Sequence, residues 1–220
     1  MSIFQHYQAR YEQAQQEEFE LQDFLTICKE DKIAYASASE RLLNAIGTPE
    51  EIDTATDPSL SRIFSNRVIS RYPAFKDFYG MEEAIEQIVS YLKHASQGLE
   101  EQKQILYLLG PVGGGKSSLA EKLKALMQKD PIYVLSANGE LSPVNDHPFC
   151  LFDAHSDGKI LKDEYNIPER YLNTIISPWA AKRLHEFKGD IAQFKVVKIY
   201  PSILDQIAIA KTEPGDDNNR

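Results

Sequence analysis

The sequence has few cysteines and no long apolar run, and both shortages narrow the class of protein. Cys28 and Cys150 are the two cysteines in 220 residues, and their separation fits neither a disulfide framework nor a zinc-ligand spacing. No apolar run approaches the ~18 residues that a membrane-spanning helix needs. Polar and aromatic residues, rather than a secretory signal, follow Met1. We therefore expect a cytoplasmic protein without a membrane partner.

The chain also carries fewer positive than negative charges. Lys and Arg number 24 against 33 for Asp and Glu, so the formal net charge is −9. Proteins that bind nucleic acid through its phosphates usually present a basic face, and no cluster of Lys and Arg stands out here. We therefore expect no nucleic-acid partner. Hydrophobic residues, at 42%, suffice for one domain of good size or two small ones.

A glycine-rich loop is the most informative feature of the chain. The stretch GPVGGGKS at 110–117 fits the phosphate-binding pattern G-x-x-x-x-G-K-[ST]. Its glycines allow several backbone N–H groups to point at one phosphate, while Lys116 brings a cation to the β- and γ-phosphates and the Ser117 hydroxyl binds Mg²⁺. The predicted nucleotide-binding residues of this loop are Gly110, Pro111, Val112, Gly113, Gly114, Gly115, Lys116, Ser117 and Ser118.

The residues on either side of the loop support this interpretation. Gln104–Leu109 is a short apolar run, typical of a buried parallel strand. After the loop, Leu119, Leu123 and Leu126 recur at helical spacing. A helix that begins near Lys116 would direct its N-terminal amides and the positive end of its dipole at the phosphate.

The order of the predicted elements indicates the fold class. A helix over Met81–His94 precedes the strand and the loop, and Ile132–Leu135 and Phe194–Tyr200 are predicted as further strands. This order favours an α/β fold of the P-loop nucleoside-triphosphatase type, with a parallel sheet and flanking helices.

Three regions are predicted along the chain. Residues 1–72 form a helical N-terminal region, residues 73–210 form the nucleotide-binding domain, and residues 211–220 form a disordered tail. Within the second region, Asn138–Gly158 is rich in turn-forming residues and is expected as a surface excursion. Pro168–Phe187 is expected as a helix that is broken near its middle.

The N-terminal region is predicted from its apolar spacing. Apolar residues repeat at helical spacing over residues 4–14 and again over Phe19–Cys28. Ser39–Ala45 is predicted as a third helix, with Gly47 as its C-terminal stop. The Gln- and Glu-rich run at 13–20 is expected as a solvated helix face. The region is interpreted as a cap packed on the nucleotide domain, with a separate partner-binding module as the alternative.

Hydrolysis normally also needs an acidic residue at the end of a neighbouring strand to hold Mg²⁺. Asp153 is the candidate, because the apolar residues 149–152 precede it. An ordinary strand leading into a turn is the competing interpretation. A second hypothesis is a transition-metal site formed by His147, Cys150, Asp153 and His155, although surface side chains around a partly buried cysteine explain the same residues.

An aromatic pair before the loop is a candidate for contact with the base. Phe78-Tyr79-Gly80 stands where a short backbone segment passes over the adenine in triphosphatases of the AAA+ class. Tyr79 and Gly80 are therefore predicted to lie against the adenine. Packing beneath the following helix is the alternative for Phe78.

Several stretches together resemble the PrkA-type bacterial serine protein kinases. They are Ser70–Phe75, Phe78–Glu82, Gly110–Ser117, Lys198–Ser202 and Lys211–Asp216. The resemblance runs over nearly all of the chain. The triple glycine in the loop and the sequence KTEPGD near the C-terminus are its most specific elements.

The resemblance implies an AAA+-like, ATP-binding N-terminal domain that uses Mg²⁺. Family members are much longer, and their C-terminal part is likened to eukaryotic protein kinases. The resemblance therefore implies transfer of phosphate from ATP to serine residues of a protein substrate, and a homo-oligomer formed through the AAA+ domain. The acidic Walker B, sensor and arginine-finger elements are expected beyond Arg220, so the chain alone is expected to be inactive.

Two rival functions use the same loop. One is a mechanochemical or scaffolding ATPase module without kinase activity of its own. The other is a small-molecule kinase or a GTPase, but the Asn-Lys-x-Asp sequence that reads guanine is absent.

Overall fold

The computed structural model describes residues 17–56, 61–62, 64–111, 113–202 and 209. The chain divides into two compact units, one made of residues 1–35 and 131–220 and the other of residues 36–130. Each unit is described by itself below. The predicted apolar stripe at 4–14, Val112 and the tail at 211–220 lie outside the described residues.

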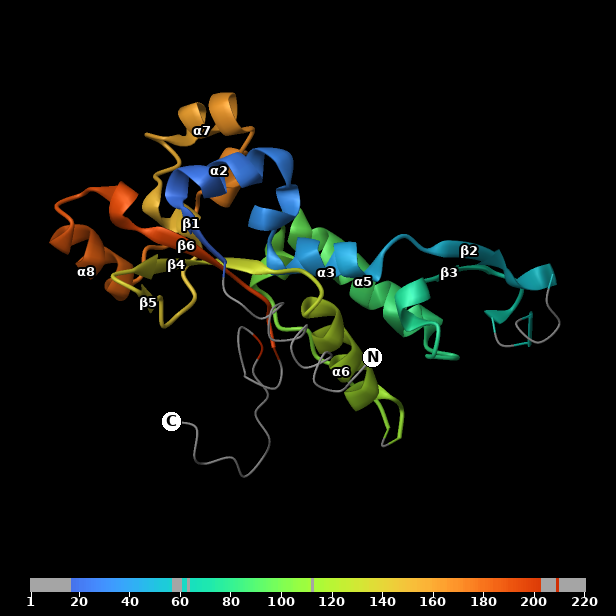
Figure 1. The fold of residues 1–220 in the computed structure, drawn as a ribbon. Coiled ribbons are helices and arrows are strands. Elements are labelled where there is room, and N and C mark those ends of the chain that lie inside the picture. Colours follow the sequence, from blue (N-terminus) through green and yellow to red (C-terminus); the bar gives the residue numbers. More distant parts are fainter. Residues whose placement is uncertain (1–16, 57–60, 63, 112, 203–208, 210–220) are drawn as a thin grey trace, which may run out of the picture. The chain divides into compact units, whose positions relative to one another are not determined.

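An antiparallel sheet organises the first unit (Figure 1). Its strands are β1 (Glu17–Glu20), β6 (Lys195–Ile199), β4 (Ile132–Ala137) and β5 (Glu140–Leu141), in the order β1-β6-β4-β5. The predicted strands at 132–135 and 194–200 are therefore confirmed. All of their pairings are antiparallel, so the parallel sheet that the sequence predicted is not found among the described strands.

A two-residue turn fixes one of these antiparallel pairings. Asn138 and Gly139 connect β4 to β5, with φ of 55° and 78°. An Asn-Gly pair with positive φ at both positions is the most favourable two-residue hairpin connection, because its twist matches that of the flanking strands. This Asn-Gly pair lies at the start of Asn138–Gly158, the segment that we expected to be a surface excursion.

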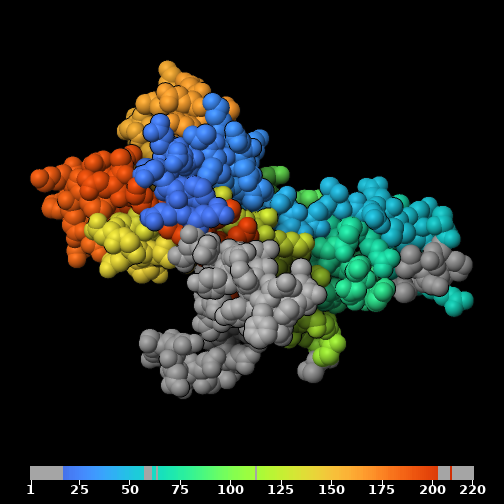
Figure 2. All heavy atoms as spheres, viewed as in Figure 1, coloured from blue at the N-terminus to red at the C-terminus, as the bar shows by residue number. Residues whose placement is uncertain are grey.

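The main core of the first unit lies between the sheet and helix α2 (Leu21–Glu30). Phe24 and Phe149 are fully buried there, and the ring of Phe24 packs 5.1 Å from that of Tyr133 on β4. Helix α7 (Gly158–Tyr165) packs on α2, and Figure 2 shows their atoms in contact at the surface. The apolar stripe that predicted a helix over 19–28 therefore faces the sheet, as amphipathic packing requires.

A second core in this unit lies beneath helix α8 (Pro178–Glu186), which buries Ala180 against Phe194. Ser177 caps the helix by accepting a hydrogen bond from the Ala180 N–H at 3.1 Å. The break predicted within 168–187 is confirmed, because α8 begins at Pro178. Before it, a short 3-10 helix at Glu169–Tyr171 replaces the first half of the expected helix.

Three helices form the core of the second unit: α3 (Ala38–Ile46), α5 (Glu82–Ser96) and α6 (Lys116–Met127). Each confirms a predicted helix. Leu42, Ile85 and Leu119, one from each helix, are buried in the same cluster. The helices are amphipathic, and burying these apolar faces against one another supplies most of their stability.

Gly47 ends α3 as the sequence predicts, and Ser37, which was not predicted as a cap, begins it. Gly47 follows the helix with φ of 81°, a left-handed conformation that favours glycine. At the other end, Ser37 accepts a hydrogen bond from the Glu40 N–H at 3.3 Å, and the Glu40 carboxylate accepts one from the Ser37 N–H at 2.8 Å. These reciprocal bonds form a capping box.

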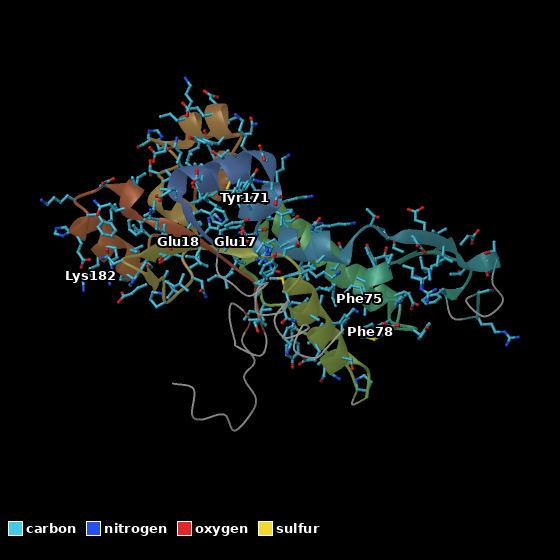
Figure 3. The ribbon with its side chains drawn as sticks, in the orientation of Figure 1. Glu17, Glu18, Phe75, Phe78, Tyr171 and Lys182 are labelled. Carbon is cyan, nitrogen blue, oxygen red and sulfur yellow. The ribbon has the colours of Figure 1, made fainter. Side chains whose placement is uncertain are left out.

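The prediction of an all-helical region over 1–72 is wrong in three places. Glu17–Glu20 is strand β1 rather than a solvated helix face, and β2 (Glu50–Asp53) pairs with β3 (Val68–Arg71) in a hairpin. Glu17 and Glu18 lie on β1 in Figure 3. Glu17 and Glu20 form ion pairs with Lys198 and Lys195 of β6, so a partner far along the sequence selects the strand.

Removal of the capping box gives a direct test of α3. We predict that Ser37→Ala lowers the free energy of unfolding by about 1 kcal/mol, because the Glu40 N–H loses its acceptor. Urea denaturation followed by circular dichroism measures the change. The matched control is Ser39→Ala in the same helix, which leaves the cap intact and should change stability very little. Equal effects of the two substitutions would contradict the role of Ser37.

Candidate nucleotide-binding site

The glycine-rich loop turns directly into α6. Gly113 and Gly115 adopt left-handed conformations with φ of 80° and 75°, and the Gly114 N–H donates to the Pro111 carbonyl at 3.2 Å. Gly115 is the N-cap of α6, and no side chain caps this helix. The N–H groups of its first turn are therefore open to an anion, at the positive end of the helix dipole.

Lys116 lies against the backbone of the loop. Its ammonium group donates hydrogen bonds to the carbonyl oxygens of Gly110 at 2.8 Å and Pro111 at 2.5 Å. These contacts hold a positive charge beside the N-terminus of α6, where the sequence predicts the β- and γ-phosphates. Ser117 and Ser118 follow in the first turn of the same helix.

The glycines of the loop are required for different reasons. A Cβ on Gly113 would meet nothing within 4 Å, so only its left-handed conformation requires glycine. A Cβ on Gly114 would lie 3.1 Å from the Pro111 carbonyl oxygen. A Cβ on Gly115 would lie 2.9 Å from the sulfur of Met81. The last two glycines therefore also make room for close contacts.

A cavity of about 400 Å³ lies beside the loop. Its walls come from one face of α5, from the segment before the loop and from the loop itself. Most of the lining residues are apolar, and Gln87 and Lys116 contribute an amide and an ammonium group. The residues that line it are Met81, Ala84, Gln87, Ile88, Leu106, Tyr107, Leu108, Leu109, Gly110, Pro111, Gly114, Lys116 and Leu119.

The prediction of a buried strand over Gln104–Leu109 is wrong in this structure. No strand is assigned there, and Ile105, Tyr107 and Leu109 are 91%, 79% and 86% exposed. Leu108 alone packs partly against the core of the second unit. A buried parallel strand needs a neighbouring strand for its backbone groups, and none of the described strands pairs with this segment.

The aromatic pair before α5 is divided between two environments. Phe78 packs edge-on against Phe75, with ring centroids 5.9 Å apart (Figure 3). It also packs against the cluster that contains Ile85 of the following helix, which is the packing alternative that the sequence left open. Tyr79 is 78% exposed, and the Arg71 guanidinium lies 5.9 Å from the centre of its ring. Gly80 has φ of 74°. The contact of Tyr79 and Gly80 with adenine stays a prediction.

Met81 is the residue that sequence reasoning missed. It follows Gly80, stands at the N-cap of α5 and lines the cavity with its sulfur close to Gly115. Tyr79 instead lines a separate cavity of about 510 Å³ together with Arg71 and Lys76. The spacing of Met81 with Ile85 and Ile88 indicated a core residue and gave no sign of its contact with the loop.

Asp153 stands in a turn rather than at the end of a strand. The preceding residues Pro148–Leu151 form a short 3-10 helix, so the strand expected there is wrong. Its carboxylate accepts hydrogen bonds from the N–H groups of Ser156 at 2.8 Å and His155 at 3.1 Å, which lower its pKa. It belongs to the first unit, whereas the loop belongs to the second. Its role as a magnesium ligand stays a prediction.

The hypothesis of a transition-metal site gains no support from the geometry. Among the described residues, no three His, Cys, Asp or Glu side chains lie close enough to hold a metal ion together. Burial and the nearby Asp146 raise the pKa of the Cys150 thiol to about 12, which disfavours the thiolate that a metal requires. His147 is engaged locally, because its Nδ1 accepts a hydrogen bond from the Phe149 N–H at 3.2 Å.

Comparisons with known proteins find a matching family model and curated relatives. The family model of the PrkA AAA domain matches residues 19–220. The chain is 74% identical over all 220 residues to "Serine/threonine kinase YeaG" of Escherichia coli (strain K12) and spans 34% of that protein. It is 30% identical over 201 residues to "ATP-dependent protease PrkA" of Bacillus subtilis (strain 168) and spans 29% of it. No solved structure matches the chain.

The chain thus covers about a third of the length of the curated relatives that it matches. None of the helices described here is long and apolar enough to cross a membrane.

Substitutions of the loop glycines should separate conformational strain from steric contact. We predict that Gly113→Ala destabilises the protein by about 1–2 kcal/mol through its left-handed backbone alone. Gly115→Ala should cost more, because its Cβ would also lie 2.9 Å from the Met81 sulfur. Urea denaturation measures both losses. Adding Met81→Ala to Gly115→Ala should recover the part of the stability that the clash with the Met81 sulfur removes. A double variant as unstable as Gly115→Ala would contradict the contact between these two residues.

Proposed function

The chain belongs to the PrkA AAA domain family, and we propose that its glycine-rich loop binds ATP together with Mg²⁺. The observation that carries the proposal is the position of Lys116. Its ammonium group lies beside the uncapped N-terminus of α6 and contacts the Gly110 and Pro111 carbonyls of the loop. This arrangement brings a cation, open N–H groups and the positive end of a helix dipole together, which favours an anion.

Each loop residue then has a role. The backbone from Gly110 to Gly115 wraps the phosphates, Lys116 neutralises charge on the β- and γ-phosphates, and the Ser117 hydroxyl holds Mg²⁺. The position of Ser117 in the first turn of α6 fits that role. When bound, Mg²⁺ supplies positive charge that stabilises the phosphoryl oxygens during transfer.

The segment Gln104–Leu109 has a place in the same proposal. We infer that it becomes the parallel strand that leads into the loop, once further strands pair with it. Its exposed residues Ile105, Tyr107 and Leu109 alternate along the segment, so they would share one face of such a strand. Completion of a parallel P-loop sheet would bury them and anchor the loop at its N-terminal side.

For the longer protein we propose an ATP-dependent serine/threonine protein kinase that acts on serine residues of a protein substrate. The 74% identity to the E. coli protein named a serine/threonine kinase supports this. The proposal includes a cytoplasmic location and a homo-oligomer formed through the AAA+ domain. An ATP-driven module without kinase activity is the second candidate, because the B. subtilis relative is named an ATP-dependent protease.

Substitution of Lys116 tests the ATP site. A hydrogen bond to a charged group contributes about 1.5–3 kcal/mol, so Lys116→Ala should weaken ATP binding by roughly 10- to 150-fold. The unfolding temperature should change little, because the lysine contacts exposed loop carbonyl groups. Isothermal titration calorimetry with Mg²⁺ and ATP measures the dissociation constant.

The matched control for this experiment is Lys122→Ala on the same helix, which lies beyond the cavity lining. It should bind ATP as the unaltered chain does. A dissociation constant that Lys116→Ala leaves unchanged would overturn the assignment of the lysine.

Turnover by the 220-residue chain provides a second test. We predict no appreciable ATP hydrolysis, because the buried strands β4 and β6 are followed by Asn138 and Tyr200 rather than by an acidic residue. A phosphate-release assay measures the rate. Steady turnover that Asp153→Asn abolishes would contradict the prediction and establish Asp153 as the missing acid.

A further inference from the structure

Glu82 is a buried acid in the first turn of α5. Only 7% of the residue is exposed. No described residue donates a hydrogen bond to its Oε2 atom or forms an ion pair with its carboxylate. A buried polar group without a partner costs free energy, and a buried charge costs more. A group that brings hydrogen-bond donors to Glu82 would therefore bind favourably there.

The position of this carboxylate on α5 is unusual. Glu82 begins a row that continues with Ile85, Val89 and Leu92. Their spacing of three or four residues places them on one face of the helix, and all four are buried. The periodicity therefore predicts an apolar side chain at position 82. The packing of the row alone does not explain an acid there.

The neighbouring acids of α5 differ from Glu82, because both have partners. The Glu83 carboxylate forms an ion pair with Arg67, and the Glu86 carboxylate accepts a hydrogen bond from the Ser70 hydroxyl at 3.2 Å. Both acids are also exposed, so water solvates their charges. The acid that is shielded from bulk water is thus the one without a donor among the described residues.

The chemistry of the carboxylate selects a basic side chain as its partner. A phosphate or a second acid would be repelled. A metal ion needs several ligands, and no three His, Cys, Asp or Glu side chains gather among the residues that the structure describes. A guanidinium or ammonium group supplies both the donors and the opposite charge. The chain spans 34% of the E. coli relative, so the rest of such a longer protein can supply this group.

We propose that Glu82 is the docking point for an arginine or lysine side chain from the part of the longer protein outside these 220 residues. The contact lies beside Met81, whose sulfur is close to Gly115 of the phosphate loop. It holds the first turn of α5, and Met81 with it, against the loop. The inference goes beyond the proposed function, and its test does not measure nucleotide binding.

Glu82→Gln should have opposite effects in the 220-residue chain and in the longer protein. In the chain it removes a buried charge without a partner, so the unfolding temperature should rise by about 2–8 °C. In the longer protein it leaves the basic side chain buried and unpaired, so the domain should unfold at a temperature lower by about 5 °C or more. Differential scanning calorimetry measures both changes.

Two variants control the experiment. Glu83→Gln removes the exposed ion pair with Arg67 in the same helical turn, and it should change the unfolding temperature very little in either protein. Glu82→Met extends the apolar row, so it should stabilise the 220-residue chain at least as much as Glu82→Gln does.

Amide hydrogen exchange gives a second measurement that locates the contact. The first turn of α5 should exchange more slowly in the longer protein than in the 220-residue chain, because docking at Glu82 opposes local opening. Glu82→Gln should abolish this difference, whereas Glu83→Gln should preserve it.

The outcomes distinguish docking from a role of Glu82 within the chain. A lower unfolding temperature of Glu82→Gln in the 220-residue chain would overturn the inference, because the α5 dipole or another residue of the chain would then stabilise the charge. An equal rise in both proteins would overturn it as well, since no basic side chain would then meet Glu82. If the unaltered chain became more stable with protein concentration and Glu82→Gln did not, the contact would belong to a second copy instead. Opposite signs together with the loss of exchange protection would support the proposed docking.

Discussion

The left-handed turn at Gly113 and Gly115 is the constraint on which the site depends. It brings the chain into α6 with a glycine as N-cap, so no side chain satisfies the first N–H groups of the helix. A capping serine or aspartate adopts an extended backbone, whereas Gly115 is left-handed and a Cβ there would lie 2.9 Å from the Met81 sulfur. The helix therefore begins with open donors, and Lys116 adds a further positive charge at the positive end of the helix dipole.

The helices of the second unit hold that turn in position. Leu119 anchors α6 in the core with Leu42 and Ile85. At the far end of α6, buried Arg41 donates a hydrogen bond to the carbonyl of Asp130. Burial lowers the pKa of Arg41 and the nearby Asp130 opposes that shift, so the guanidinium stays charged in a nearly dry site. Both ends of α6 are therefore fixed.

Local signals in the sequence were enough for the two helices of the site. The spacing of Ile85, Ile88 and Leu92 predicted α5, and the loop pattern predicted the start of α6 at Lys116. Features that depend on distant partners were missed. Glu20 pairs with Lys195 across 175 positions, so β1 had no local signal. The closeness of Met81 to Gly115 likewise arises from packing between helices, which periodicity does not encode.

The error over Gln104–Leu109 has a different cause, because the local pattern there is strong. The residues form a continuous apolar run, but a parallel strand forms only when neighbouring strands pair with its backbone groups. The helix side of the phosphate loop is therefore fixed by contacts within the second unit, whereas the strand side lacks a partner among the described strands. The phosphate contacts that we propose would then come from the loop, Lys116 and the first turn of α6. Turnover also requires an acidic residue on a strand beside the loop, and for that reason binding and hydrolysis should separate in this chain.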